Sequence, residues 1–242
     1  MNRSSLLVKV TGTTCGVFLA AACFAQPPAY KGKPFADDFH KSGPQTIPGT
    51  VQAALYDLGG EGIAYHDTDA VNHGSGDLNY TQGCQPGTSP YICHFREKEG
   101  VDISYIKDRI DLAHNHSSFR PDREQLYIGW AADGEWTNYT VDVKNAGSYT
   151  VYAVYQGQAN TFQFSIDNKP AAVLKFPIDM KGTPLTDEKG WHNWNKAVVG
   201  QITFPEKGLH LLTLHYNAGD GFAYFEFVLN PDSSEWLQQL KK

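Results

Sequence analysis

The sequence predicts an all-β fold, a sandwich of two antiparallel sheets. Two observations lead to this prediction. Short runs in which apolar and polar residues alternate are separated by Gly, Asn, Asp and Pro, as in β-sandwiches. No run of helical periodicity is long enough to supply the crossover helices of a parallel sheet. The 242 residues, 41% of them hydrophobic, are enough for one large β domain or two small ones.

Residues 1–25 are expected to be a secretory signal peptide. Arg3 and Lys9 supply positive charge, and the apolar run that ends at Ala25 is too short to span a bilayer. Cleavage after Ala25 would leave a secreted or periplasmic protein without a membrane span. The alternative is a lipoprotein signal, in which Cys23 carries a lipid anchor.

Residues 26–46 are expected to be a linker, because several prolines mix with glycine and polar residues without periodicity. The sandwich is expected over residues 47–230, followed by a C-terminal tail at 231–242. Residues 71–99 and 107–124 are polar and irregular, which predicts long loops that carry function or cover a sheet edge.

The strands are predicted where apolar residues recur at every second position, because such residues point to one face of a sheet. A core-facing row of side chains is expected in each of these runs. The clearest runs are Tyr149–Tyr155, Phe162–Ile166, Leu212–Tyr216 and Phe225–Phe227.

Removal of the signal would leave two cysteines, Cys84 and Cys93, with eight residues between them. In an exported protein such a pair is expected to form a disulfide. A loop this short would gain about 2–3 kcal/mol of stability. Two cysteines alone do not make a metal site, so we expect no bound metal here.

Composition and motifs exclude several functions. The net charge is −6 without clustering, which argues against binding to nucleic acid or to anionic membranes. The sequence has no P-loop, dinucleotide fingerprint, GxSxG or HExxH motif. His114 and His116 lack the carboxylate or cysteine spacing of a metal site.

The segment from Gly190 to Trp194 is the most informative in the chain. Two tryptophans three positions apart fall on opposite faces of a β pattern, so both cannot lie in the core of a simple strand. An exposed indole is typical of a surface that stacks on sugar rings. The alternative is that one tryptophan covers the end of the sandwich.

A series of short blocks lies along residues 47–230. The blocks are Ile47–Gly49, Tyr56–Gly62, Ala64–Asp69, Phe95–Arg96, Glu99–Ile103, Gly129–Trp130, Gly134–Trp136, Tyr139–Val141, Gly147–Val151, Gly190–Trp191 with Trp194, and Tyr224–Phe227. In this order they resemble carbohydrate-binding module family 6. The resemblance implies a jelly-roll β-sandwich with a sugar cleft in the loops at one end, where two aromatic rings enclose a sugar.

The resemblance also implies which residues contact the sugar. Trp191 matches one aromatic wall of the cleft, and Phe95 stands where the family usually has a Tyr that forms the other wall. Glu61 matches a carboxylate at the cleft edge that bonds sugar hydroxyls.

Three further residues complete the expected set of hydroxyl-binding groups. The family places an Asn on the loop before the last strand, where this chain has Gly221, so Asp220 or Asn217 is expected to take its place. Asn193 and Arg96 are the other two expected contacts. Trp130 matches a core position of the family.

The calcium pattern of the family is not matched. The positions where the family has two Glu and an Asp or Asn hold Gln52, Ala54 and Ala223. Alanine cannot ligate Ca²⁺, which takes six or more oxygens. We therefore expect no calcium at this place and no other cofactor.

These observations together predict a non-catalytic, monomeric protein that binds a poly- or oligosaccharide by aromatic stacking in a loop cleft. The alternative is a jelly-roll polysaccharide lyase or glycoside hydrolase that uses Glu61, His66 and Asp67, since a glycosidase needs two carboxyl groups across a bond. A third class is a protein-binding module, which would show a flat apolar patch instead of a cleft with facing aromatics.

Overall fold

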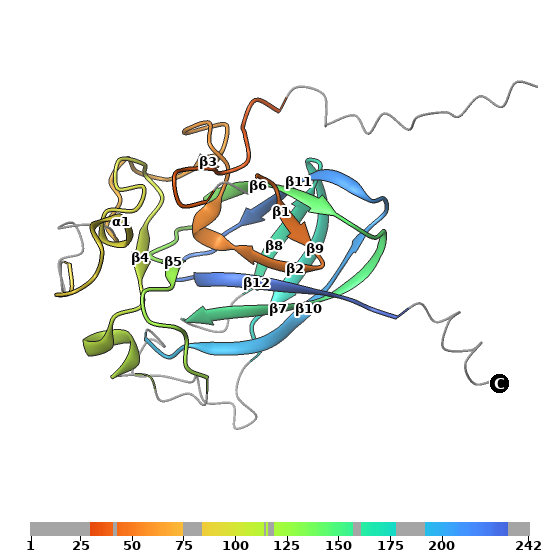
Figure 1. The fold of residues 1–242 in the computed structure, drawn as a ribbon. Coiled ribbons are helices and arrows are strands. Elements are labelled where there is room, and N and C mark those ends of the chain that lie inside the picture. The colour runs from red at the N-terminus through yellow and green to blue at the C-terminus, as the bar shows by residue number, and fades with distance from the viewer. Residues whose placement is uncertain are drawn as a thin grey trace, which may run out of the picture.

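The computed structural model describes residues 30–40, 43–74, 84–113, 115, 119–156, 161–177 and 192–231. In this part of the chain, twelve strands form two sheets, and nearly all strand pairs are antiparallel (Figure 1). The helical segments that the structure describes are short. The predicted all-β jelly-roll sandwich is therefore confirmed.

The first sheet has the strand order β1-β6-β11-β8-β9, with β3 also paired to β6. Strand β1 runs parallel to β6, and the other pairs are antiparallel. The strands are β1 (Gln45–Ile47), β3 (Tyr65–His66), β6 (Trp136–Val143), β8 (Thr161–Ile166), β9 (Lys169–Lys175) and β11 (Gly208–His215).

The second sheet has the strand order β10-β7-β12-β5-β4, with β2 also paired to β12. Strand β12 is central, because it pairs with β7 along one edge and with β2 and β5 along the other. The strands are β2 (Gly49–Gln52), β4 (Ile103–Tyr105), β5 (Leu126–Ile128), β7 (Gly147–Gln156), β10 (Asn195–Phe204) and β12 (Gly221–Leu229).

The short helical segments lie in the connections between strands. They are η1 (Ala53–Leu55), α1 (Pro90–Cys93) and the π-helical η3 (Asp108–Leu112). Helix α1 starts where a helix is favoured, because Ser89 accepts a hydrogen bond from the N–H of Ile92 and Pro90 occupies the first helical position. The predicted irregular regions thus contain one turn of α-helix and one π-helical turn.

The core lies between the two sheets and is rich in phenylalanine. Phe164 of β8 meets Phe225 of β12 edge-on, with ring centroids 5.1 Å apart. Phe162 lies 5.1 Å from Phe222, again across the two sheets. The residues that alternate in the four predicted runs are buried as expected, because each inner face contributes every second side chain.

A tight turn joins β8 to β9. Asp167 and Asn168 both adopt left-handed conformations, with φ of 50° and 62°. These are the residue types that tolerate this region best, and a turn with two positive φ values fits the twist of a hairpin. Asp167 also accepts a hydrogen bond from the N–H of Leu211, which fastens the turn to β11.

The described part of the predicted linker packs against the sandwich. The N–H of Lys33 donates to the carbonyl of Leu58, and Phe35 is buried in the main core cluster. Tyr91 donates its hydroxyl proton to Asp37, with 2.6 Å between the oxygens. The segment from residue 30 to 40 is therefore bound to the domain, which corrects the expectation of a free linker.

Residues 1–29 and 232–242, which contain the predicted signal peptide, Cys23 and nearly all of the predicted tail, lie outside the described residues. None of the helices that the structure describes has the length and apolar character needed to cross a membrane. The Cys84–Cys93 disulfide is present, as predicted, with the two Cα atoms 5.6 Å apart.

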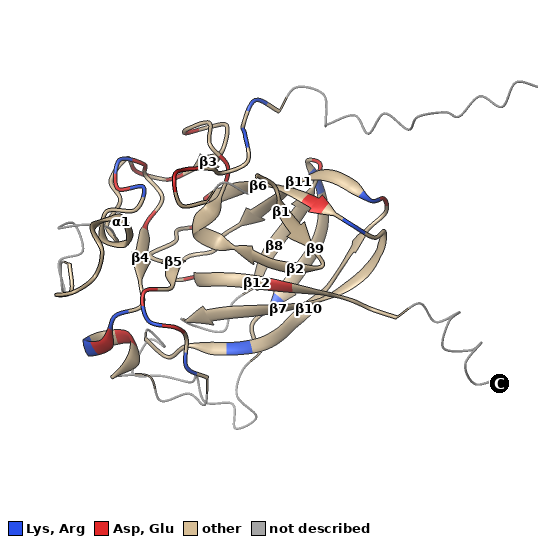
Figure 2. Cartoon of the chain, in the orientation of Figure 1, with Lys and Arg blue, Asp and Glu red and all other residues tan. Residues whose placement is uncertain are grey.

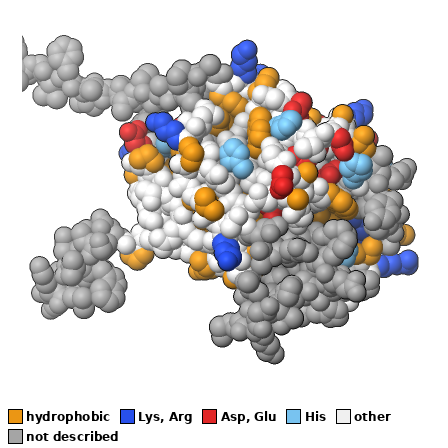
Figure 3. Space-filling view, turned by 180° about the vertical axis from the view of Figure 1, so that it is seen from behind, with side chains coloured by type: hydrophobic (Ala, Val, Ile, Leu, Met, Phe, Trp, Pro, Cys, Tyr) orange, Lys and Arg blue, Asp and Glu red, His pale blue; other side chains and the backbone are white. Residues whose placement is uncertain are grey.

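Charged residues lie mainly on the loops, and several acidic residues occur in the loops beside β3 (Figure 2). On the face seen in Figure 3, the described hydrophobic side chains are scattered among polar ones. A flat apolar patch of the kind expected for a protein-binding module is not seen on this face.

Candidate functional site

One end of the second sheet gathers several of the predicted site residues. The register pairs Gly221 at the start of β12 with Gln156 at the end of β7, and Asn195 at the start of β10 with Tyr155. A Cβ atom on Gly221 would lie 2.9 Å from the side chain of Gln156. The segments that precede β10 and β12, which carry Asn193 and Asp220, therefore lie at the same end of the domain.

The segment before β10 is held by contacts that the sequence did not reveal. The N–H of His192 donates to the side-chain oxygen of Gln156 at 2.7 Å. Its Nδ1 lies 3.0 Å from a carboxylate oxygen of Asp111 in η3. Asp111 is buried and its other oxygen accepts the N–H of Lys107 at 2.8 Å. Two separate elements thus fix His192, the residue that follows Trp191.

Trp194 is fully buried, with 0% of its surface exposed, as expected for the core member of the tryptophan pair. Its indole meets Tyr127 edge-on at 4.9 Å, and the backbone N–H of Trp194 donates to the side-chain oxygen of Asn115 at 3.1 Å. Asn193 is buried beside it, and its predicted contact with a sugar stays a prediction. The chain turns inward at His192, whose φ of 65° is left-handed. Trp191 itself lies outside the described residues, so its predicted role stays a prediction.

Asp220 is buried at the start of β12, with 1% of its surface exposed. One carboxylate oxygen accepts the N–H of Asn217 at 2.9 Å. The other has no hydrogen-bond partner among the described residues. Burial, together with the nearby carboxylate of Asp133, raises the pKa of Asp220 to about 7. Asp220 is therefore a carboxyl group that gains or loses its charge near neutral pH.

Asp220→Asn is expected to stabilise the protein more at pH 8 than at pH 5. The folded pKa of about 7 lies above the unfolded value of about 4, so the folded chain holds the proton in this window and stability falls as pH rises through it. We expect the gain over wild type to grow by about 2–3 kcal/mol between pH 5 and pH 8. Denaturant titration at both pH values measures this. Asp38→Asn, at an exposed aspartate of the N-terminal segment, is the control, and a gain independent of pH would contradict the assignment.

Glu61 lies in an acidic pocket of about 320 Å³, beside Asp67 and Asp69. One of its oxygens lies 2.6 Å from Nδ1 of His66, and the other accepts the N–H of Asp67. Burial raises the pKa of Asp67 to about 6, with further contributions from the carboxylates of Glu135, Asp69 and Glu61. The residues lining this pocket do not include Asp220 or Asn193. Glu61 therefore lies with His66 and Asp67, the other two residues of the predicted lyase or hydrolase site.

Phe95 is a core residue, with 3% of its surface exposed. Its ring lies 5.5 Å from Phe35 and 5.5 Å from Tyr91. Phe35 comes from the N-terminal segment, which the sequence predicted to be a free linker. The prediction that Phe95 forms a cleft wall is corrected because this segment covers it.

Arg96 is likewise part of the packing, with 4% of its side chain exposed. Its guanidinium group lies 3.4 Å from the ring centroid of Tyr56 and pairs with Glu99 at 2.9 Å. It also donates to the backbone carbonyl of Asp57 at 2.9 Å. The guanidinium group is therefore already bound by residues of the protein interior. This corrects the prediction that Arg96 bonds sugar hydroxyls.

Trp130 is exposed, although the family resemblance predicts it in the core. The structure leaves 39% of its surface exposed. Its ring stacks on Tyr127 at 6.3 Å with an interplanar angle of 14°. Its neighbour Gly129 lies near Gln156, because a Cβ atom on Gly129 would be 3.9 Å from the Gln156 side chain. Gln156 also accepts the N–H of His192, so Trp130 directly follows a residue at the same end of the sheet. Trp130 has a left-handed φ of 53°, an uncommon conformation for a residue other than glycine.

The residues at the family's calcium position do not fit the ion. Ala54 and Ala223 are buried methyl groups, and Ala223 belongs to the cluster around Trp194. Gln125 donates to the side-chain oxygen of Gln52 at 2.9 Å, and the N–H of Gln52 donates to Gln45 at 2.7 Å. Amide hydrogen bonds therefore join these segments directly.

Chelator is expected to leave the melting temperature unchanged, and added Ca²⁺ is expected to have no effect. The reason is that neutral amides connect the segments around Gln52. Gln52→Ala should instead lower the free energy of unfolding by about 1 kcal/mol, because the hydrogen bond that Gln125 donates to the Gln52 side chain is lost. Thermal melts by circular dichroism with chelator and with Ca²⁺ measure this. A rise of several degrees on adding Ca²⁺ would contradict the prediction.

Comparison with known proteins gives one family. Residues 113–228 match carbohydrate binding module family 6. This segment contains Trp130, Gln156, His192, Trp194 and Asp220. No curated protein matches the chain.

Solved structures with similar folds are available, at low sequence identity. A family 6 module from Clostridium stercorarium in complex with cellobiose is 10% identical, with a TM-score of 0.43 over 78% of this chain and 99% of that one. A β-1,3-glucan-binding family 6 module from Bacillus halodurans is 13% identical, with a TM-score of 0.40 over 76% and 98%. An arabinoxylan arabinofuranohydrolase from Bacillus subtilis is 11% identical, with a TM-score of 0.40 over 81% and 30%.

Proposed function

We propose that this chain, of which residues 113–228 match carbohydrate binding module family 6, binds a poly- or oligosaccharide without transforming it. The family match is the observation that carries the proposal, because it covers the loops that meet at one end of the second sheet. Trp191 supplies one stacking surface, and Asp220 and Glu61 are candidates for bonding sugar hydroxyls.

The contacts of His192 support the role of Trp191. Aromatic stacking gains affinity when the ring is held in place before the sugar arrives, because less conformational freedom is lost on binding. Gln156 and Asp111 fix the residue that follows Trp191, from β7 and from η3. Trp194, three positions on, is anchored in the core. The residues that directly follow Trp191 are therefore held by β7, by η3 and by the core.

Trp130 is our candidate for the second aromatic surface, in place of Phe95. It is 39% exposed, it follows Gly129, whose backbone approaches Gln156, and Tyr127 stacks behind it. Tyr127 also contacts Trp194 at 4.9 Å, so one buried ring supports both tryptophan segments. Sugar rings bind to indole faces through their C–H groups, and an indole backed by a second ring is a rigid platform for this.

A glycan array with the protein, followed by calorimetry on the best ligand, tests the function. Binding to a defined class of glycan is expected. Trp130→Ala should weaken binding to that glycan by about 5–50-fold if Trp130 is the second platform, by analogy with other aromatic stacking. Retained affinity in Trp130→Ala would remove Trp130 from the site, and the absence of any bound glycan would contradict the function itself.

The enzyme alternative rests on the acidic pocket around Glu61, where Asp67 has a raised pKa of about 6. We expect no release of reducing ends or unsaturated products from plant, algal or fungal polysaccharides. One oxygen of Glu61 lies against Nδ1 of His66, and the other accepts the N–H of Asp67. Turnover that disappears in Glu61→Gln or His66→Ala, but persists in the control His73→Ala, would establish an enzyme.

A further inference from the structure

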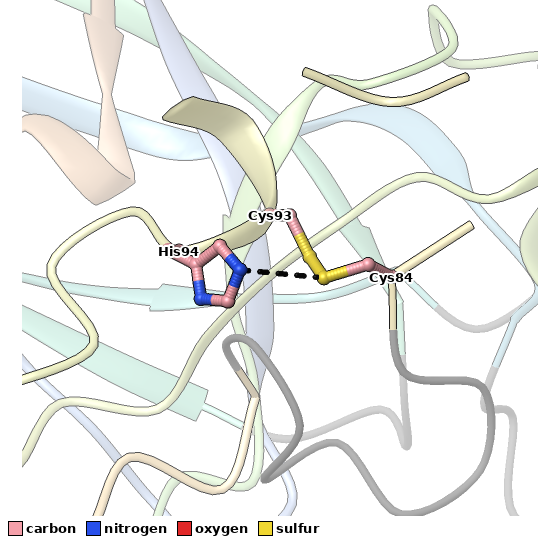
Figure 4. Close-up of side chains that lie close together, drawn as sticks. All are labelled: Cys84, Cys93 and His94. Atoms are coloured by element: carbon pink, nitrogen blue, oxygen red, sulfur yellow. Dashed lines mark hydrogen bonds between the residues drawn. A yellow bond between two sulfur atoms is a disulfide. The ribbon is translucent and has the colours of Figure 1, made fainter. Parts of the chain in front are cut away.

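The end of helix α1 places an imidazole against the disulfide (Figure 4). Cys93 is the last residue of α1 and His94 follows it. Nε2 of His94 lies 3.7 Å from Sγ of Cys84. Cys93 is buried, whereas Cys84 and His94 are exposed to solvent. The two sulfurs and the ring nitrogen lie within 4.8 Å of one another. Solvent can reach this group of atoms, because Cys84 and His94 are exposed.

Glu97 determines which nitrogen of His94 faces the sulfur. A carboxylate oxygen of Glu97 lies 2.6 Å from Nδ1 of His94. Because a carboxylate accepts and does not donate, the proton of the neutral ring lies on Nδ1. The lone pair is then on Nε2, which points to Cys84. In zinc sites, a ligating histidine commonly donates its other ring N–H to a carboxylate. His94 is held by Glu97 in this way, with its free nitrogen near the two sulfurs.

The spacing of these atoms suits a tetrahedral ion. With Zn–S bonds of about 2.3 Å and Zn–N bonds of about 2.0–2.1 Å, nitrogen and sulfur ligands of one zinc lie about 3.6 Å apart. The separation between His94 and Cys84 is 3.7 Å before any metal binds. The two sulfurs would have to move apart to about 3.8 Å once their bond is broken. Cys84 lies in an exposed loop, where side-chain rotation can supply this movement.

We propose that Cys84, Cys93 and His94 form a zinc site when the disulfide is reduced, with water as the fourth ligand. A dithiol reductant breaks the S–S bond, transfers two electrons and two protons to the sulfurs, and is itself oxidised to a disulfide. Binding of Zn²⁺ then releases both thiol protons, and two thiolates and Nε2 coordinate the ion. Disulfide and metal site are alternative states of the same three residues. The proposal does not depend on sugar binding.

Cobalt titration of the reduced protein tests the site, because Co²⁺ occupies zinc sites and reports its ligands by absorption. Under anaerobic conditions, reduced wild type should show a thiolate-to-cobalt charge-transfer band that Zn²⁺ abolishes. The oxidised protein should show none. His94→Ala should bind Co²⁺ at least 10-fold more weakly, and Glu97→Gln about 10–100-fold more weakly. His73→Ala, an exposed histidine paired with Asp69 at 3.1 Å, is the matched control and should bind like wild type.

Circular dichroism of the reduced protein accompanies the titration. A reduced chain that has unfolded would still bind cobalt through its two thiols, but His94→Ala would then bind as tightly as wild type. Equal affinity of wild type and His94→Ala therefore overturns the proposal, whether the chain is folded or not. The absence of a charge-transfer band in reduced wild type overturns it as well.

Discussion

Trp194→Ala is expected to lower the free energy of unfolding by about 3–5 kcal/mol, the cost of deleting a large buried aromatic side chain. The indole is fully buried, and its cluster includes Tyr127, Ile106, Val154 and Ala223 from other segments. These neighbours belong to the second sheet and the segments beside it, so they cannot easily collapse into the space that the indole leaves. Denaturant titration monitored by circular dichroism measures the change.

Trp130→Ala is the matched control, because it removes the same side chain from a site with 39% exposure. We expect it to cost about 1 kcal/mol or less, mainly through the lost stacking on Tyr127. Equal losses in the two variants would show that Trp194 is not the core member of the pair.

Trp191→Ala is expected to reduce affinity for the bound glycan by about 5–150-fold, which corresponds to about 1–3 kcal/mol of aromatic stacking. Stability should stay close to wild type, because a residue that stacks on ligand does not contribute to the core. The effect should be large because Asp111 and Gln156 hold the adjacent His192. Calorimetry with the glycan identified on the array gives the affinity, and denaturant titration gives the stability.

Phe39→Ala provides the control for this second prediction. Phe39 is an aromatic residue with 69% exposure in the N-terminal segment, outside the part of the chain that matches the family. Its removal should leave glycan affinity unchanged. If Trp191→Ala instead binds as tightly as wild type while losing stability, the roles of the two tryptophans are the reverse of those assigned here.

The fold could be predicted from the sequence because strand periodicity is a local property. The alternation of Phe162, Phe164 and Ile166 places all three on one face of β8, and the structure buries all three. Phe225 and Phe227 of β12 follow the same rule. The disulfide could also be predicted, since two cysteines with a short loop leave one pairing.

The site could be predicted only in part, because exposure depends on segments that are distant in the sequence. Phe95 and Arg96 are buried by Phe35 and Tyr56, and no local pattern at residues 95–96 announces this. Trp130 is exposed although the family resemblance implies a core position, because it lies beyond the end of β5 in a left-handed conformation. The pairing of His192 with Asp111 joins residues 81 positions apart, beyond the reach of any motif.

The central position of β12 governs how the chain can fold. Residues 221–229 pair with β7 on one side and with β2 and β5 on the other, so the second sheet is incomplete until they are in place. Among the described strands, β12 comes last in the chain. Its pairing with β2 joins partners more than 170 positions apart, a topology that is typical of slow folding. Until β12 pairs, β7, β2 and β5 lack their shared neighbour, so the apolar inner face of this sheet stays open to non-native contacts.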